Sequence, residues 1–316
     1  GKITYRVERD RRSIEGSTVF FLATFLAVHL PLLLLTEVDR VVSVLVAVQI
    51  ALLVTILEAI SLDGADNLIV PIGTYLLLLR LAPQPAETLL LQLAAQLTIL
   101  AVLFLLAWRL RMLTAAGTLA ASLFLYGVWS LGGLAWLVGP VIALGVFGVV
   151  LRLAAEINHG PSARYQVLAV FYTALVPLAV LLLNDVLRTA VRPSSWNAGE
   201  PMYPLFLGTI AGHLALLCLI FWTGTPWVRS ARAPQIVGSF LLGAAAIVPA
   251  GFLVHPIFPL RYAIAAALLP LLATLLYLAA NRHGRLPHER PWDGRLQAAS
   301  VAASALLIAP FLLPLG

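Results

Sequence analysis

The sequence has very little charge: only 11% of its 316 residues are Asp, Glu, Lys or Arg. Soluble domains carry about 25% charged residues, so an ordinary soluble globular protein is excluded. There is one cysteine, Cys218, which excludes an intrachain disulfide and a thiolate metal site. No CxxC, HExxH or Walker-type glycine loop occurs, and Ser, His and Asp show no arrangement that indicates a hydrolase.

Apolar residues make up 61% of the sequence, and the mean hydropathy is +0.98. Apolar segments of 16 to 22 residues recur along the chain. They predict an all-α, polytopic integral membrane protein with about 11 transmembrane helices, or ten if segment 67–82 is re-entrant. The predicted spans are 17–36, 41–60, 67–82, 87–108, 113–131, 133–152, 166–187, 204–222, 235–254, 260–280 and 296–315.

The distribution of basic residues predicts the orientation. If the N-terminus is cytoplasmic and all segments cross, fifteen Lys and Arg residues lie inside and five outside. This is the positive-inside bias, and it is lost if segment 67–82 does not cross. The net charge of +6 is therefore explained by topology, with no nucleic acid as a partner. We expect a bacterial-type cytoplasmic membrane, with the N-terminus and loop 61–66 in the cytoplasm.

A polar segment, EAISLDGADNLIVP, separates the second and third apolar segments and places Glu58, Asp63, Asp66 and Asn67 within ten residues. An acid at the centre of a spanning helix costs about 2.5–3.5 kcal/mol, so acids beside the hydrocarbon layer need partners. We predict that these four residues form a catalytic group in which Asp63 and Asp66 hold Mg²⁺. The alternative is simple helix capping at the start of segment 67–82.

A basic segment, RDRRSIEGST, precedes the first span. Arginines can hold phosphate oxygens in a fork, and hydroxyls and glycine amides can donate to the same anion. The predicted cofactor-binding residues are Arg11, Arg12, Ser13, Glu15, Gly16 and Ser17; of these, Glu15 would bind a metal or orient an arginine instead of holding phosphate. The alternative is a positive-inside flank in which Ser13 or Ser17 caps the helix. Because the first two spans are antiparallel, this segment and loop 61–66 should be neighbours.

Together, RRSIEGS and EAISLDGADNLIVP resemble the motifs of the phytol kinase and dolichol kinase family, which is related to the CDP-diacylglycerol synthases. Ser13, Glu15, Gly16 and Ser17 match the first motif, with Arg12 where lysine is usual. The second motif is matched by Glu58, Ser61, Asp66, Asn67 and Pro71. The resemblance covers 1–82 and implies the C-terminal part of a catalytic domain. A G-D-G-x-A-D element of that family would lie before Gly1, so we expect the sequence to be a piece of a longer chain.

A second resemblance covers about 88–255, within a Gly- and Ala-rich membrane bundle over 83–316. LTAAGTLAASLFLYGVWSLGG and ARYQVLA are similar to segments of the phytyl-phosphate kinase family. The acidic motif D-T-x-A-S-E-x-G of that family is absent, since the comparable stretch from Gly212 to Gly224 has no carboxylate. We therefore expect a structural or lipid-docking role for this half.

The resemblances imply Mg²⁺-dependent phosphoryl transfer from CTP or ATP to a membrane polyisoprenoid alcohol. Two alternatives stay open: a cytidylyltransferase that forms a CDP-activated lipid, and a non-enzymatic lipid-binding or transport protein. The expected partners are a membrane lipid or prenol and a nucleotide. The sequence also leaves open whether the chain forms a homodimer.

Overall fold

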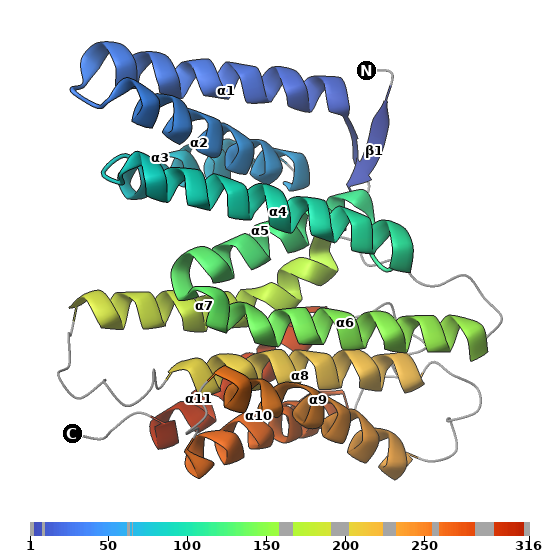
Figure 1. Ribbon diagram of the computed structural model, residues 1–316. Coiled ribbons are helices and arrows are strands. Elements are labelled where there is room, and N and C mark those ends of the chain that lie inside the picture. Colours follow the sequence, from blue (N-terminus) through green and yellow to red (C-terminus); the bar gives the residue numbers. More distant parts are fainter. Residues whose placement is uncertain are drawn as a thin grey trace. The chain divides into compact units, whose positions relative to one another are not determined.

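The computed structural model describes residues 3–7, 10–61, 64, 66–157, 167–190, 202–223, 232–254, 259–281 and 294–312. Over these residues the chain is an all-α polytopic membrane protein with one small β-hairpin (Figure 1). Ten of the described helices are long and apolar enough to cross a membrane. The elements are β1 (Thr4–Val7), β2 (Asp10–Ser13), α1 (Ile14–Leu35), α2 (Arg40–Ile60), α3 (Asp66–Leu81), α4 (Ala86–Leu110), α5 (Ala115–Gly132), α6 (Leu134–Ile157), α7 (Val167–Ala190), α8 (Met202–Thr223), α9 (Arg232–Val254), α10 (Leu260–Ala280) and α11 (Gly294–Leu312).

Each predicted apolar segment coincides with one helix, so the fold class predicted from the sequence is confirmed. The described helix that misses the length of a candidate span is α3, which has 16 residues. Several helices contain an internal proline, such as Pro31 in α1 and Pro71 in α3. Proline is tolerated in membrane helices because neighbouring groups satisfy the backbone that it frees.

The chain divides into two compact units, which are described separately. Unit 1 comprises Gly1–Tyr126 and Arg164–Val170, and unit 2 comprises Gly127–Ala163 and Phe171–Gly316. This division differs from the predicted boundary at residue 82, because α4 and most of α5 pack with the N-terminal elements. Leu89 of α4 and Ala116 of α5 belong to the buried core clusters of unit 1.

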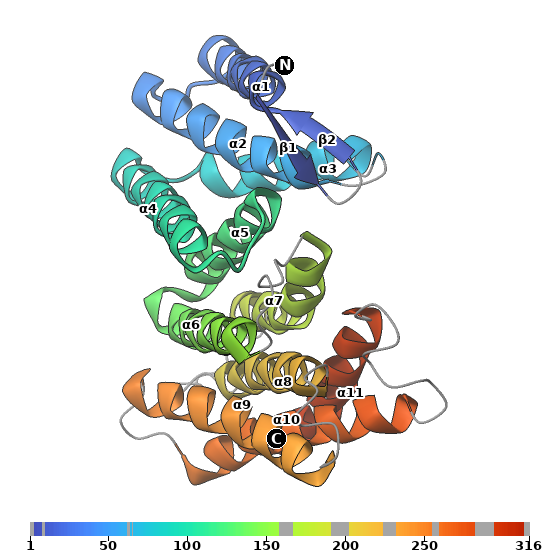
Figure 2. The ribbon, with the colours of Figure 1, turned by 90° about the vertical axis from the view of Figure 1, so that its right-hand side faces the viewer.

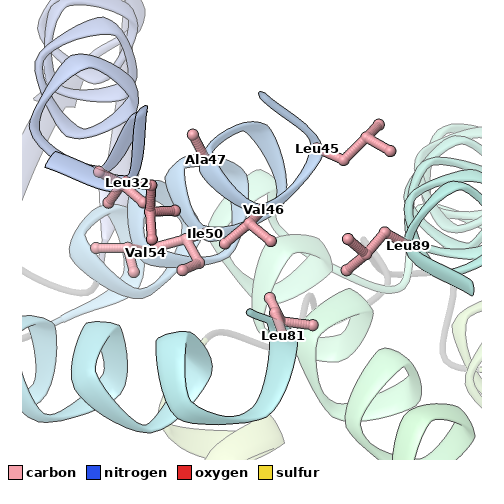
Figure 3. Packing of buried hydrophobic residues seen from close by; sticks show 9 residues of the cluster. Leu32, Leu45, Val46, Ala47, Ile50, Val54, Leu81 and Leu89 are labelled. Atoms are coloured by element: carbon pink, nitrogen blue, oxygen red, sulfur yellow. The ribbon is translucent and has the colours of Figure 1, made fainter. Parts of the chain in front are cut away.

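The core of unit 1 is built around α2. Within unit 1, α1 runs away from the hairpin and α2 returns to it (Figure 1). Figure 3 shows the buried side chains of α2, among them Val46 and Ile50, between Leu32 of α1, Leu81 of α3 and Leu89 of α4. In contrast, most of the large apolar side chains of α1 are exposed, as expected for a helix that faces lipid.

Unit 2 is organised around α8, of which 94% of the spanning window is buried. Gly208 and Gly212 form a G-x-x-x-G pair, and a Cβ on either would lie 3.0–3.1 Å from Leu269 of α10. On another face of α8, a Cβ on Gly243 of α9 would lie 2.6 Å from the carbonyl oxygen of Ala211. Small residues thus allow close helix packing in an environment where hydrophobicity drives no association.

Candidate functional site

The N-terminal segment folds into an antiparallel hairpin of β1 and β2. Tyr5 pairs with Arg12, and Arg6 pairs with Arg11. Residues directly opposite each other in an antiparallel pair project to the same face, and the faces alternate along each strand. Tyr5 and Arg12 therefore share a face with Val7, which is fully buried. Arg6 and Arg11 occupy the other face and are exposed.

Arg12 joins the hairpin to the end of α2. Its guanidinium forms an ion pair and a hydrogen bond with the carboxylate of Glu58, and its second terminal nitrogen donates to the carbonyl of Ser61 at 3.5 Å. The side chains of Arg12 and Glu58 are 25% and 15% exposed. Glu58 lies in the last turn of α2, where the helix dipole disfavours a negative charge. The guanidinium of Arg12 therefore offsets both the carboxylate of Glu58 and the partial negative charge of the helix end.

The serines and Glu15 of the first motif are in contact with the hairpin and the start of α1. Ser13 is the N-cap of α1, and its hydroxyl accepts from the amide of Gly16 at 3.1 Å. A carboxylate oxygen of Glu15 accepts from the amide of Ile3 at 3.1 Å, and the hydroxyl of Ser17 lies 3.1 Å from that of Tyr5. The capping role considered for Ser13 is present in the structure.

The second motif lies at the junction of α2 and α3. Ser61 is the C-cap of α2, and its hydroxyl donates to the carbonyl of Glu58 at 3.0 Å. Gly64 has a φ of +77°, a conformation that favours glycine, and its carbonyl accepts from the amide of Asn67 at 3.2 Å. Asp66 is half-buried in the first turn of α3, and Asn67 is exposed.

Asp63, one of the two predicted magnesium ligands, lies outside the described residues. Within the described part of the chain, no three His, Cys, Asp or Glu side chains are close enough to hold a metal ion together. The donors that the structure does describe here are the carboxylate of Asp66 and the amide of Asn67, both oxygen ligands of the kind that Mg²⁺ prefers. Mg²⁺ usually keeps waters and phosphate oxygens as further ligands, so a protein contribution of one or two carboxylates fits it.

Next to the hairpin, unit 1 contains a cavity of about 390 Å³. Its walls are almost entirely apolar side chains of α1, α2, α4 and α5, including Leu52 and Phe104. The hydroxyl groups of Tyr5, Ser17 and Thr18 are among its few polar groups. Its size falls within the roughly 300–1,000 Å³ typical of small-molecule sites, and its apolar walls suit a hydrocarbon chain.

The sequence correctly predicts that Arg12 lies near Glu58 and Ser61, but Tyr5 and Arg6 were missed. The signal for both was present in the sequence, because the residues of ITYRV alternate in polarity as a half-buried strand does. The structure places Arg11 on the exposed face of the hairpin, next to Arg6 and opposite to Arg12.

The fold therefore defines an integral membrane protein with a polar site at one end of unit 1. Comparisons with protein-family models, with curated proteins and with solved structures found no match to this chain.

Proposed function

We propose that the chain phosphorylates a membrane polyisoprenoid alcohol, with CTP or ATP as donor and Mg²⁺ as cofactor. The observation that carries the proposal is the apolar cavity that begins at Tyr5 and Ser17, because Tyr5 faces the same side of the hairpin as Arg12. An isoprenoid chain in this cavity would place its hydroxyl near the polar junction of α1, α2 and α3. In this proposal the N-terminus and the junction face the cytoplasm, where nucleotides are.

The residues take the following roles. Arg11 and Arg12 hold phosphate oxygens, aided by Ser13, Gly16 and Ser17 around the start of α1, and Glu15 orients an arginine or binds the metal. Arg6 adds a second exposed guanidinium, because it pairs directly with Arg11 across the two strands. Two like charges in such a pair repel each other unless an anion or water lies between them, so the pair suits a bound phosphate. Asp63 and Asp66 would hold Mg²⁺, which neutralises charge on the transferring phosphoryl group. Asn67 orients the substrate.

The reaction is a displacement at the terminal phosphorus. The alcohol oxygen forms a bond to phosphorus while the bond to the bridging oxygen breaks, and the nucleoside diphosphate leaves. The hydroxyl proton passes to a carboxylate, for which Glu58 is our candidate. Such a transfer depends on positioning and charge neutralisation more than on covalent catalysis.

The test uses the purified full chain in detergent with a panel of prenols and terminally radiolabelled CTP or ATP. We expect label in the extracted lipid, and Asp66→Asn should reduce the rate by about 10²-fold. Glu87→Gln is the matched control, because Glu87 is also an acid in the first turn of a helix, α4, and is exposed. Label transfer at an unchanged rate in Asp66→Asn would reject the assignment.

Release of pyrophosphate instead of a nucleoside diphosphate would show the cytidylyltransferase chemistry. A second candidate function, passive lipid binding, is favoured by two observations: Arg12 is already paired with Glu58, and Ser13 already caps α1. It predicts that a photoactivatable prenol labels the cavity while no phosphoryl transfer occurs. It also predicts no thermal stabilisation by CTP, ATP or Mg²⁺ at millimolar concentration.

A further inference from the structure

Three side chains inside unit 1 carry polar atoms that have no hydrogen-bond partner among the described residues. These atoms are the amide nitrogen and oxygen of Gln96, the amide oxygen of Gln49 and the hydroxyl of Thr55. Gln96 is 3% exposed and Gln49 is fully buried. Buried polar groups are nearly always paired in proteins, so a group of unpaired ones requires an explanation.

The two glutamines lie deep in the layer that the helices span. Gln49 is nine residues from the first residue of α2, and Gln96 is ten residues from that of α4. At 1.5 Å per residue these offsets are about 13–15 Å, which is half of a hydrocarbon core of about 30 Å. Lipid tails offer no hydrogen bonds at that depth, so they cannot pair these groups.

A chain of amides links this site to the turn between α3 and α4. Gln84 donates to the carbonyl of Arg80 at 2.9 Å, and Gln92 donates to Gln84 at 2.7 Å. The amide nitrogen of Gln49 lies 3.4 Å from the amide oxygen of Gln92 and donates to the hydroxyl of Tyr126 at 2.6 Å. Gln92 and Gln84 are half-buried, so exposure falls along the chain toward Gln49.

One of the unpaired groups lines the cavity, and the two glutamines lie one helical turn from residues that do. Leu52 follows Gln49 by three residues, and Leu100 follows Gln96 by four, so each pair shares one face of its helix. Both leucines line the cavity, as does Thr55 itself. The cavity therefore comes within one helical turn of both glutamines along their helices, although only Thr55 of the three residues is part of its lining.

We propose that Gln49 and Gln96 bind a hydroxyl group in the middle of the membrane layer. A hydroxyl both donates and accepts, so it matches the unpaired amide N–H and amide oxygen of Gln96 and the unpaired amide oxygen of Gln49. An ion of either sign would satisfy only one kind of group. The hydroxyl belongs either to water or to a lipid alcohol in the cavity. The site stands independently of the proposed function, because water is sufficient to fill it.

Cysteine labelling tests for the hydroxyl in a Cys218→Ala background. Gln96→Cys is compared with Ile50→Cys, because Ile50 is fully buried in the core around α2, lies ten residues from the start of its helix as Gln96 does, and does not line the cavity. A small membrane-permeant methanethiosulfonate reacts with the thiolate, which forms readily only where the thiol is hydrated. We expect at least about tenfold faster labelling at position 96, equivalent to one unit of thiol pKa. Equal rates at the two positions would overturn the proposal.

The source of the hydroxyl is tested in the same assay. A long-chain isoprenoid alcohol or the alkane of the same carbon skeleton is added before the reagent. Slower labelling of position 96 with the alcohol alone assigns the hydroxyl to a lipid. Fast labelling that neither compound alters assigns it to water.

A second variant keeps the proposal testable if Gln96→Cys does not fold. Gln96→Met has a similar shape but cannot bind a hydroxyl, and Leu103→Met, at a buried position of the same helix, is its control. If a hydroxyl is bound, Gln96→Met removes its partner and the Tm in detergent falls below that of the control. If the amide is truly unpaired, its removal raises the Tm. An unchanged or raised Tm would contradict the proposal.

Discussion

The ion pair between Arg12 and Glu58 is the contact that attaches the hairpin to α2, and its removal is the most direct test of the site. We replace each residue with methionine, which keeps much of the side-chain length and removes the charge. The two single variants and the double variant form a double-mutant cycle. The cycle separates the pair's interaction from the effect of each substitution alone.

The expected magnitude follows from the exposure of the two side chains. At 25% and 15% exposed, the pair lies between a surface pair, worth about 0.2–1 kcal/mol, and a buried pair, whose breaking costs about 3–5 kcal/mol. We expect each single variant to lose about 1–3 kcal/mol, with a coupling energy of about 1–2 kcal/mol. Arg12→Met should cost more than Glu58→Met, because it leaves a carboxylate at the negative end of the α2 dipole.

The assay is reversible unfolding of the full chain in mixed micelles, followed by circular dichroism. Arg11→Met is the matched control, since Arg11 is the adjacent arginine of the same strand on the exposed face of the hairpin. Its effect should stay within about 0.5 kcal/mol. If the double variant loses the sum of the two single losses, the side chains do not interact and the hairpin docks by other contacts.

Three further predictions concern packing, capping and the interior amides. Gly243→Ala places a Cβ 2.6 Å from a carbonyl oxygen of α8 and should lower the free energy of unfolding by about 1–3 kcal/mol. Gly145→Ala is the control, since its Cβ would have no neighbour within 4 Å, and it should leave the stability equal or higher. Both variants are measured by thermal unfolding. Ser13→Ala removes the N-cap of α1 and should cost about 0.5–2 kcal/mol, and Ser13→Gly only a few tenths, in the same assay. Tyr126→Phe removes the 2.6 Å hydrogen bond from Gln49 and should cost about 0.6–1.7 kcal/mol in a detergent unfolding titration; no loss would show that the amide finds another partner.

The helices could be predicted from the sequence because membrane spans have a strong signal. A run of about 20 apolar residues has few alternatives in a bilayer, so the predicted and observed helices coincide even where prolines interrupt them, as Pro31 does in α1. The hairpin could not be predicted in the same way. Its strands have four residues each, and the charges of DRRS match a positive-inside flank as well as an exposed strand.

The site was predicted in part for the same kind of reason. Antiparallel packing of the first two spans brings Arg12 near Glu58, and this proximity follows from the sequence. The direct pairing of the two side chains does not, because it depends on which face of the hairpin each arginine occupies. The interior glutamines were missed altogether. Gln92 and Gln96 are four residues apart in an apolar segment, and that spacing on one helix face was the available signal.

The course of α3 follows from its neighbours in unit 1. At 1.5 Å per residue its 16 residues extend about 24 Å, short of a hydrocarbon core of about 30 Å. However, Leu81 at its end and Leu89 near the start of α4 both pack with Val46, in the first half of α2, far from the hairpin. The connection from Leu81 to Ala86 has five Cα–Cα steps and reaches at most about 18 Å, too short to return to the hairpin before α4 begins. We infer that α3 carries the chain from one end of unit 1 to the other, and that the membrane thins or the flanking residues extend to match its length.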